Sequence, residues 1–152
     1  MKSLLVKGLV LALLLLLVVF IGGWKMGLIG GKENVGPDVL HVTSSGPLPG
    51  YHFTPVDRTI RDVKSVQQLY NAAYALQTVS PSSHYFCPLD TGLVYHLTFL
   101  HGTTVLQTMD LSATGCQLLH SASLSTRRST NAFNMELAHM LNRSSLQPDL
   151  RS

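Results

Sequence analysis

The hydrophobic pattern first separates an apolar N-terminal run from the rest of the chain. Residues 9–21 are apolar without interruption, and no charge occurs in residues 8–24. As a helix rising about 1.5 Å per residue, this stretch reaches roughly 25 Å, at the short end for a bilayer crossing. Lys2 and Lys7 precede it without any acidic residue, which favours a cytoplasmic N-terminus.

We therefore expect residues 1–7 in the cytoplasm and an uncleaved signal-anchor over residues 8–25 that crosses the cell membrane once. The alternative is a cleaved signal peptide, but its apolar region usually has only about 7 to 15 residues. The sequence Gly-Gly-Trp-Lys-Met-Gly that follows is also a poor cleavage site. Both interpretations place the rest of the chain outside the cytoplasm.

Glycine, proline and serine are frequent in residues 26–50. Such a composition buries too little apolar surface to offset the chain entropy lost on folding. We expect a flexible linker here, with at most a short extended piece over residues 39–43.

Residues 51–80 predict a strand followed by a helix. Residues 51–60 are rich in β-favouring side chains, but Pro55 makes them an edge strand or an interrupted one. Asp62 has the character of an N-cap whose carboxylate accepts backbone N–H groups. Helical spacing of apolar residues then continues to about residue 78, and Ser80-Pro81 ends the helix.

Two alternating segments, residues 93–100 and 105–111, predict a β-hairpin. Tyr95, Leu97 and Phe99 share one face of the first, and Val105, Met109 and Leu111 share one face of the second. Because paired residues must share a face, this parity requires an odd-numbered loop, either residues 102–104 or 100–104.

The remaining pattern predicts a third strand over residues 116–124, a closing helix over 131–142 capped by Ser129 or Thr130, and a disordered tail over 144–152. The expected fold class is α+β. It comprises an N-terminal transmembrane helix and a domain at residues 51–143, in which a long helix and a short C-terminal helix pack a three- to four-stranded antiparallel sheet. The expected core consists of Val66, Leu69, Ala73, Tyr95, Leu97, Phe99, Met109, Phe133, Leu137 and Leu141.

Charge argues against nucleic acid as a partner. The formal net charge is +3, but seven basic and seven acidic residues balance one another after residue 33. A phosphate-binding surface needs a clustered excess of Lys and Arg.

Cysteine and histidine are the residues with candidate chemistry. Cys87 and Cys116 are the only two cysteines, and in an exported chain two cysteines most often form a disulfide. A disulfide that closes the loop between them would stabilise the folded state by roughly 3 to 4 kcal/mol. A reactive or metal-binding thiol is the alternative, with His84 near Cys87.

The seven histidines include no pair with helical ligand spacing, although His96 and His120 can share a sheet face. We predict no metal site, no cofactor and no catalytic residue. No hydrolase motif occurs, which favours a protein that is not an enzyme.

One group of proteins has a similar order of elements. The helix Asp62-Val-Lys-Ser-Val-Gln-Gln-Leu-Tyr-Asn-Ala-Ala-Tyr-Ala-Leu, then Cys-Pro-x-Asp-x-Gly from Cys87, Tyr95-His-Leu-Thr-Phe and Gly115-Cys116 resemble small, uncharacterised secreted or lipid-anchored bacterial proteins. The resemblance covers about residues 59–141 and implies an exported bacterial domain with its two cysteines paired. It brings no activity, and this chain lacks the lipidation cysteine.

The sequence thus favours a membrane-tethered extracytoplasmic interaction module whose partner is a protein or a cell-envelope component. One alternative is an extracytoplasmic hydrolase inhibitor that presents the loop at residues 80–87 or the loop at Gly102. The other is a small metal-binding envelope protein that uses its histidines.

Overall fold

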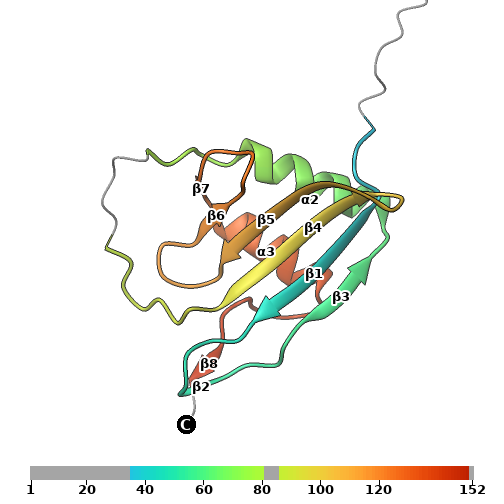
Figure 1. The fold of residues 1–152 in the computed structure, drawn as a ribbon. Coiled ribbons are helices and arrows are strands. Elements are labelled where there is room, and N and C mark those ends of the chain that lie inside the picture. Colours follow the sequence, from blue (N-terminus) through green and yellow to red (C-terminus); the bar gives the residue numbers. More distant parts are fainter. Residues whose placement is uncertain (1–34, 81–85, 151–152) are drawn as a thin grey trace, which may run out of the picture. The chain divides into compact units, whose positions relative to one another are not determined.

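The computed structural model describes residues 35–80 and 86–150, and these form a small α+β domain (Figure 1). The elements follow in the order β1 (Val39–Ser45), β2 (Tyr51–His52), β3 (Asp57–Ile60), α2 (Val63–Ala75), β4 (Val94–His101), β5 (Thr104–Ser112), β6 (Leu118–His120), β7 (Arg127–Arg128), α3 (Asn131–Met140) and β8 (Asp149–Leu150). Six strands build an antiparallel sheet in the order β3-β1-β4-β5-β6-β7, and β2 pairs with β8 in a separate ribbon. The predicted class is confirmed, with more strands than expected.

The stretch expected to be a flexible linker contains a central strand. β1 pairs with β3 on one side and with β4 on the other, and Leu40 and Val42 are fully buried. The short extended piece expected over residues 39–43 is present as β1, but its assignment to a flexible linker is wrong, because the compact unit begins at Val35. The cause is that glycine and proline flank a short alternating segment, whose buried residues Leu40 and Val42 pair with β4 residues more than fifty positions away along the chain.

The predicted hairpin of β4 and β5 is present, but a β-bulge rather than an odd-numbered loop aligns the inward-facing residues of its two strands. His101 pairs with Thr104, so the turn has only two residues between them. The odd residue is Leu106, which lies unpaired where the register shifts and forms a β-bulge. Val105 consequently lies opposite Leu100 and is exposed, so its predicted place beside Met109 is wrong.

One face of the sheet carries the core. Both helices lie on this side (Figure 1), and all ten residues predicted for the core are buried there. The ring of Phe99 is 5.1 Å from that of Tyr70 on α2, which joins helix and sheet directly. No helix of the described residues lies over the opposite face of β1, β4 and β5 (Figure 1).

The two helices begin where the sequence predicts. Asp62 is the N-cap of α2, but its carboxylate accepts from the Ser65 hydroxyl at 2.5 Å and makes no bond to a backbone N–H. That part of the prediction is wrong. Thr130 caps α3, because its hydroxyl oxygen accepts the Phe133 N–H at 3.2 Å.

The edge strands also follow their sequence cues. The β-favouring stretch around Pro55 is interrupted, with β2 before the proline and β3 after it at the edge of the sheet. The predicted third strand is shorter than expected, because only the three residues of β6 pair with β5 and β7.

The C-terminal segment was expected to be a disordered tail, and through residue 150 that expectation is wrong. Leu146 is buried in the core, and its carbonyl oxygen accepts the Tyr95 hydroxyl at 3.0 Å. Burial raises the pKa of this hydroxyl, although the nearby Arg143 acts in the opposite direction. β8 then closes the segment against β2. One leucine among polar residues gives no periodic signal, so the sequence could not show this docking.

In the part of the chain that the structure describes, no helix is both long enough and apolar enough to cross a membrane. The predicted signal-anchor at residues 8–25 lies outside the described residues, as does His84.

Candidate functional site

The disulfide predicted from the sequence is present. Cys87 and Cys116 are bonded, with their Cα atoms 4.9 Å apart, inside the usual range of about 4.4 to 6.8 Å. Cys87 precedes β4 and Cys116 follows β5. The bond therefore joins the segments that flank the two strands, at the end of the hairpin opposite Gly102.

A polar network next to the disulfide fixes the chain on both sides of it. The Thr91 N–H donates to the Thr114 hydroxyl at 2.9 Å, and the two buried hydroxyls are 3.0 Å apart. Asp90 accepts from the Gly92 N–H at 3.0 Å. Gly115 has a φ of +64°, and a Cβ there would lie 3.0 Å from the Cβ of Asp90, so no other residue fits without displacement. The segment that leads to Cys116 is thus rigidly placed.

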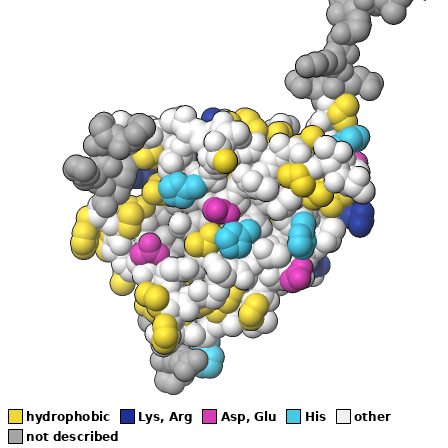
Figure 2. Space-filling view, viewed as in Figure 1, with side chains coloured by type: hydrophobic (Ala, Val, Ile, Leu, Met, Phe, Trp, Pro, Cys, Tyr) yellow, Lys and Arg dark blue, Asp and Glu magenta, His cyan; other side chains and the backbone are white. Residues whose placement is uncertain are grey.

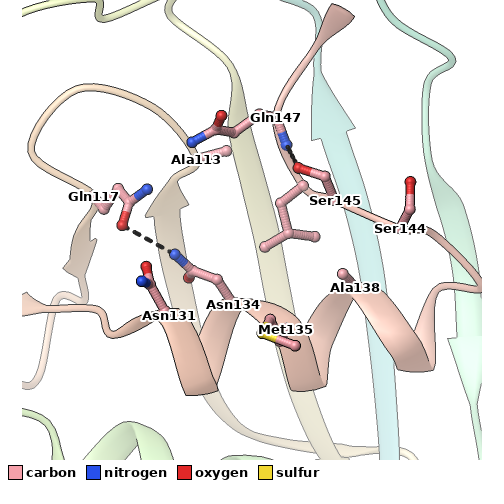
Figure 3. A pocket seen from close by; sticks show the side chains of 10 residues that line it. Ala113, Gln117, Asn131, Asn134, Met135, Ala138, Ser144, Ser145 and Gln147 are labelled. Atoms are coloured by element: carbon pink, nitrogen blue, oxygen red, sulfur yellow. Dashed lines mark hydrogen bonds between the residues drawn. The ribbon is translucent and has the colours of Figure 1, made fainter.

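Gln117, which follows Cys116, lines a pocket of about 250 Å³ (Figure 3). We call it the carboxamide pocket. Three segments line it: the turn after β5, one face of α3, and the segment before β8. Its polar lining consists of four side-chain carboxamides and two hydroxyls, from Gln117, Asn131, Asn134, Gln147, Ser144 and Ser145. Its apolar lining comes from Ala113, Met135, Ala138 and Leu146.

Helix geometry explains why α3 contributes to both core and pocket. Asn131, Asn134, Met135 and Ala138 follow the i, i+3, i+4, i+7 spacing of one helix face. Figure 3 shows Asn131 and Asn134 projecting from α3 toward Gln117. The neighbouring face, with Phe133 and Leu137, enters the core.

A tight reversal after α3 brings the C-terminal segment back to the pocket. Asn142 adopts a φ of +57°, which asparagine tolerates better than most residues. The Arg143 N–H bonds the Ala138 carbonyl at 2.8 Å, and the Asn142 N–H bonds the His139 carbonyl at 3.0 Å. This is the hydrogen-bond pattern of a Schellman motif. It directs Ser144 and the residues after it along α3.

Hydrogen bonding in the pocket is incomplete. The Asn134 amide donates to the Gln117 side-chain oxygen at 3.2 Å, but the buried Asn134 carbonyl oxygen has no partner among the described residues. An unpaired buried polar group costs about 1 to 3 kcal/mol. Gln117 also has a φ of +51°, a conformation that costs a non-glycine residue roughly 1 to 2 kcal/mol. Unfavourable terms of this kind cluster at functional sites.

A second pocket, of about 430 Å³, adjoins the first, and we call it the disulfide-side pocket. Gln117 and Gln147 line both pockets. Its other lining residues are mostly apolar or small, namely Tyr51, Pro88, Leu89, Thr91, Thr114, Gly115 and Pro148. Leu89 combines 85% exposure with a φ of +58°, which is costly for a branched apolar side chain. No charged side chain of the described residues lines either pocket.

Three histidines, His41, His96 and His120, lie on the other face of the six-stranded sheet. His96 and His120 share that open face, as the sequence allowed. Asp110 on β5 lies between them and is the cross-strand neighbour of both. His96 Nδ1 is 2.8 Å from the Asp110 carboxylate, and His41 Nε2 is 2.9 Å from the Asp57 carboxylate. Figure 2 shows histidine and acidic side chains close together on this face.

These histidines do not form a metal site in the structure. His120 Nδ1 is 3.1 Å from the Thr126 hydroxyl, so its imidazole is engaged away from Asp110. Among residues 35–80 and 86–150, no three His, Cys, Asp or Glu side chains are grouped so that they could hold a metal ion. The thiol alternative for Cys87 does not apply to the oxidised pair, and its suggested partner His84 is not described.

Comparisons with family models, with curated proteins and with solved structures gave no match to this chain. The site is therefore defined by its own geometry. Sequence reasoning found the disulfide but missed the pocket residues. The only signal for them was the pair Asn131 and Asn134 on a helix face next to the apolar stripe, and carboxamides there are equally typical of a solvated surface.

Proposed function

We propose that this chain is a membrane-tethered extracytoplasmic binding module whose ligand site is the carboxamide pocket. One observation carries the proposal: four carboxamides from three separate segments converge on one uncharged pocket and leave a buried carbonyl oxygen unpaired. Carboxamides carry both donors and acceptors, and buried ones are normally satisfied within the protein.

The chemistry of the lining supports binding rather than catalysis. Ser144 and Ser145 carry hydroxyl groups, but among the described residues no His, Asp, Glu, Lys or Cys lines the carboxamide pocket to act as a general base. The hydroxyl of Ser145 instead accepts the Gln147 N–H at 3.0 Å and stabilises the local turn.

Two features support the location. The apolar run over residues 9–21, preceded by two lysines, is typical of a signal-anchor. The disulfide between Cys87 and Cys116 is of the kind that persists in oxidising compartments and is rare in the cytosol. Together they favour a domain held outside the membrane, where it can meet an envelope or extracellular ligand.

Replacing Asn134 with alanine tests whether this residue serves binding rather than the stability of the fold. Binding residues are often retained at a cost in stability. The variant removes the unpaired carbonyl and gains roughly half a kcal/mol of helix propensity, which offsets the lost bond to Gln117. We expect the free energy of unfolding, measured by denaturant titration of the full-length protein, to stay unchanged or to rise.

Thr114→Ala is the matched control, because the Thr114 hydroxyl belongs to the satisfied network beside the disulfide. This control leaves the buried Thr91 N–H without its acceptor and should cost about 1 to 3 kcal/mol. If Asn134→Ala costs as much as the control, the carboxamide cluster is structural and the proposed site is wrong.

A further inference from the structure

We propose that the carboxamide pocket and the disulfide-side pocket form one groove that binds a neutral oligosaccharide. This inference rests on the proposed function, since it names the ligand class of the same site. It depends on three properties of the groove: its continuity, its uncharged polar lining, and its apolar wall.

The two pockets adjoin, because Gln117 and Gln147 line both of them. The smaller pocket measures about 250 Å³ and the larger about 430 Å³. Together they fall well within the range of roughly 300 to 1,000 Å³ that is typical of ligand sites. A ligand that fills both must be extended and have more than one unit, rather than a single small ring.

The polar lining selects a neutral ligand whose groups both donate and accept hydrogen bonds. Among the described residues that line the two pockets, carboxamides and hydroxyls are the only polar side chains, so an ionised ligand would find no countercharge there. A sugar hydroxyl can donate to a carboxamide oxygen and accept from a carboxamide N–H, and four carboxamides line the carboxamide pocket. Vicinal hydroxyls match carboxamides that lie side by side, as do Asn134 and Gln117, which are joined by a 3.2 Å hydrogen bond from the Asn134 amide to the Gln117 side-chain oxygen.

The disulfide-side pocket supplies an apolar wall for the C–H face of a sugar ring. Tyr51, Pro88 and Leu89 form this wall, and Leu89 is almost fully exposed on a strained backbone. Tyrosine is well suited to such a surface, because it combines an apolar ring with a polar hydroxyl. The disulfide holds together two segments that line the disulfide-side pocket, since Cys87 precedes Pro88 and Cys116 lies between Gly115 and Gln117.

Two substitutions separate binding from folding. Gln117 and Leu89 both have positive φ values, so Gln117→Gly and Leu89→Gly relieve strain while they remove a carboxamide or an apolar contact. Gln68→Ala, on the exposed surface of α2, is the control. The full-length protein in lipid nanodiscs is titrated with cellotetraose, chitotetraose and maltotetraose. Tetragalacturonate serves as the charged probe and N-acetyl-tetraalanine amide as the neutral peptide. Binding is followed by saturation-transfer NMR and calorimetry.

We expect at least one neutral tetrasaccharide to bind, and the charged one to bind at least tenfold more weakly. Each glycine variant should raise the dissociation constant of the neutral sugar about tenfold or more without lowering the melting temperature, whereas Gln68→Ala should change neither. No binding by any neutral tetrasaccharide overturns the inference. Peptide binding alone that depends on Gln117 overturns the sugar and keeps the pocket as the site. If neither glycine variant raises the dissociation constant of the sugar, the groove is not the sugar site, and the proposed function of the pocket is wrong as well.

Discussion

Replacing Leu97 with alanine should lower the free energy of unfolding by about 2 to 5 kcal/mol. Leu97 is fully buried and lies in the central strand β4, where it pairs with Val42 on one side and Met109 on the other. Truncation removes apolar contacts and leaves a cavity that rigid neighbouring strands cannot fill. The free energy of unfolding of a typical domain is about 5 to 15 kcal/mol, so this loss is a large part of it.

The control for Leu97→Ala is Thr108→Ala on the open face of β5, where the side chain is exposed. We expect the control to change the free energy of unfolding by no more than about 0.5 kcal/mol. Chemical denaturation of both variants gives the comparison. A Leu97→Ala loss as small as that of the control would mean that the two faces of the sheet are assigned the wrong way round.

Removing the disulfide should have an effect of similar size. The double variant Cys87→Ser, Cys116→Ser should lose roughly 3 to 4 kcal/mol, because the bond restricts the unfolded chain by closing a loop whose ends are 29 positions apart. In a domain of this size the melting temperature should fall by about 10 °C or more. The pocket should loosen with it, because Gln117 directly follows Cys116.

Reducing agent provides the control for the disulfide prediction. It should lower the melting temperature of the unmodified protein toward that of the double variant and leave the double variant unchanged. Thiol counting under denaturing conditions should find no free thiol in freshly exported protein. Two free thiols, or a double variant as stable as the parent, would contradict the assigned role of the bond.

The features that the sequence could predict are those governed by neighbours along the chain. Helix α2 and the hairpin of β4 and β5 follow directly from periodicity, and the cysteine pair follows from the hairpin and the expected location. All ten predicted core residues are buried because each belongs to an element with a clear apolar face.

The features that the sequence could not predict depend on distant partners. β1 consists of a few alternating residues between glycines and prolines, and only its pairing with β3 and β4 makes it a strand. The bulge at Leu106 replaces the odd-numbered loop, since both solutions satisfy the same parity. The docking of Leu146 and the reversal at Asn142 are also tertiary features.

The candidate site belongs to this second group. Its carboxamides come from three segments that meet only in the folded domain, and none of these residues forms a motif along the sequence. Asparagine and glutamine on a helix face or in a loop are common solvated residues. The proposed role rests on their convergence, on the lack of charged side chains among the described lining residues, and on the unpaired carbonyl oxygen of Asn134.

The central claim is that this domain is held outside the cytoplasm by an uncleaved membrane segment and presents its groove there. Protease protection in bacterial cells that express the untagged chain tests it most directly. We expect the full-length protein in the membrane pellet after a high-salt wash, and digestion of the domain when protease is added to intact spheroplasts. Full-length protein in the cytosol, or a secreted fragment that begins near Met26, would contradict the claim.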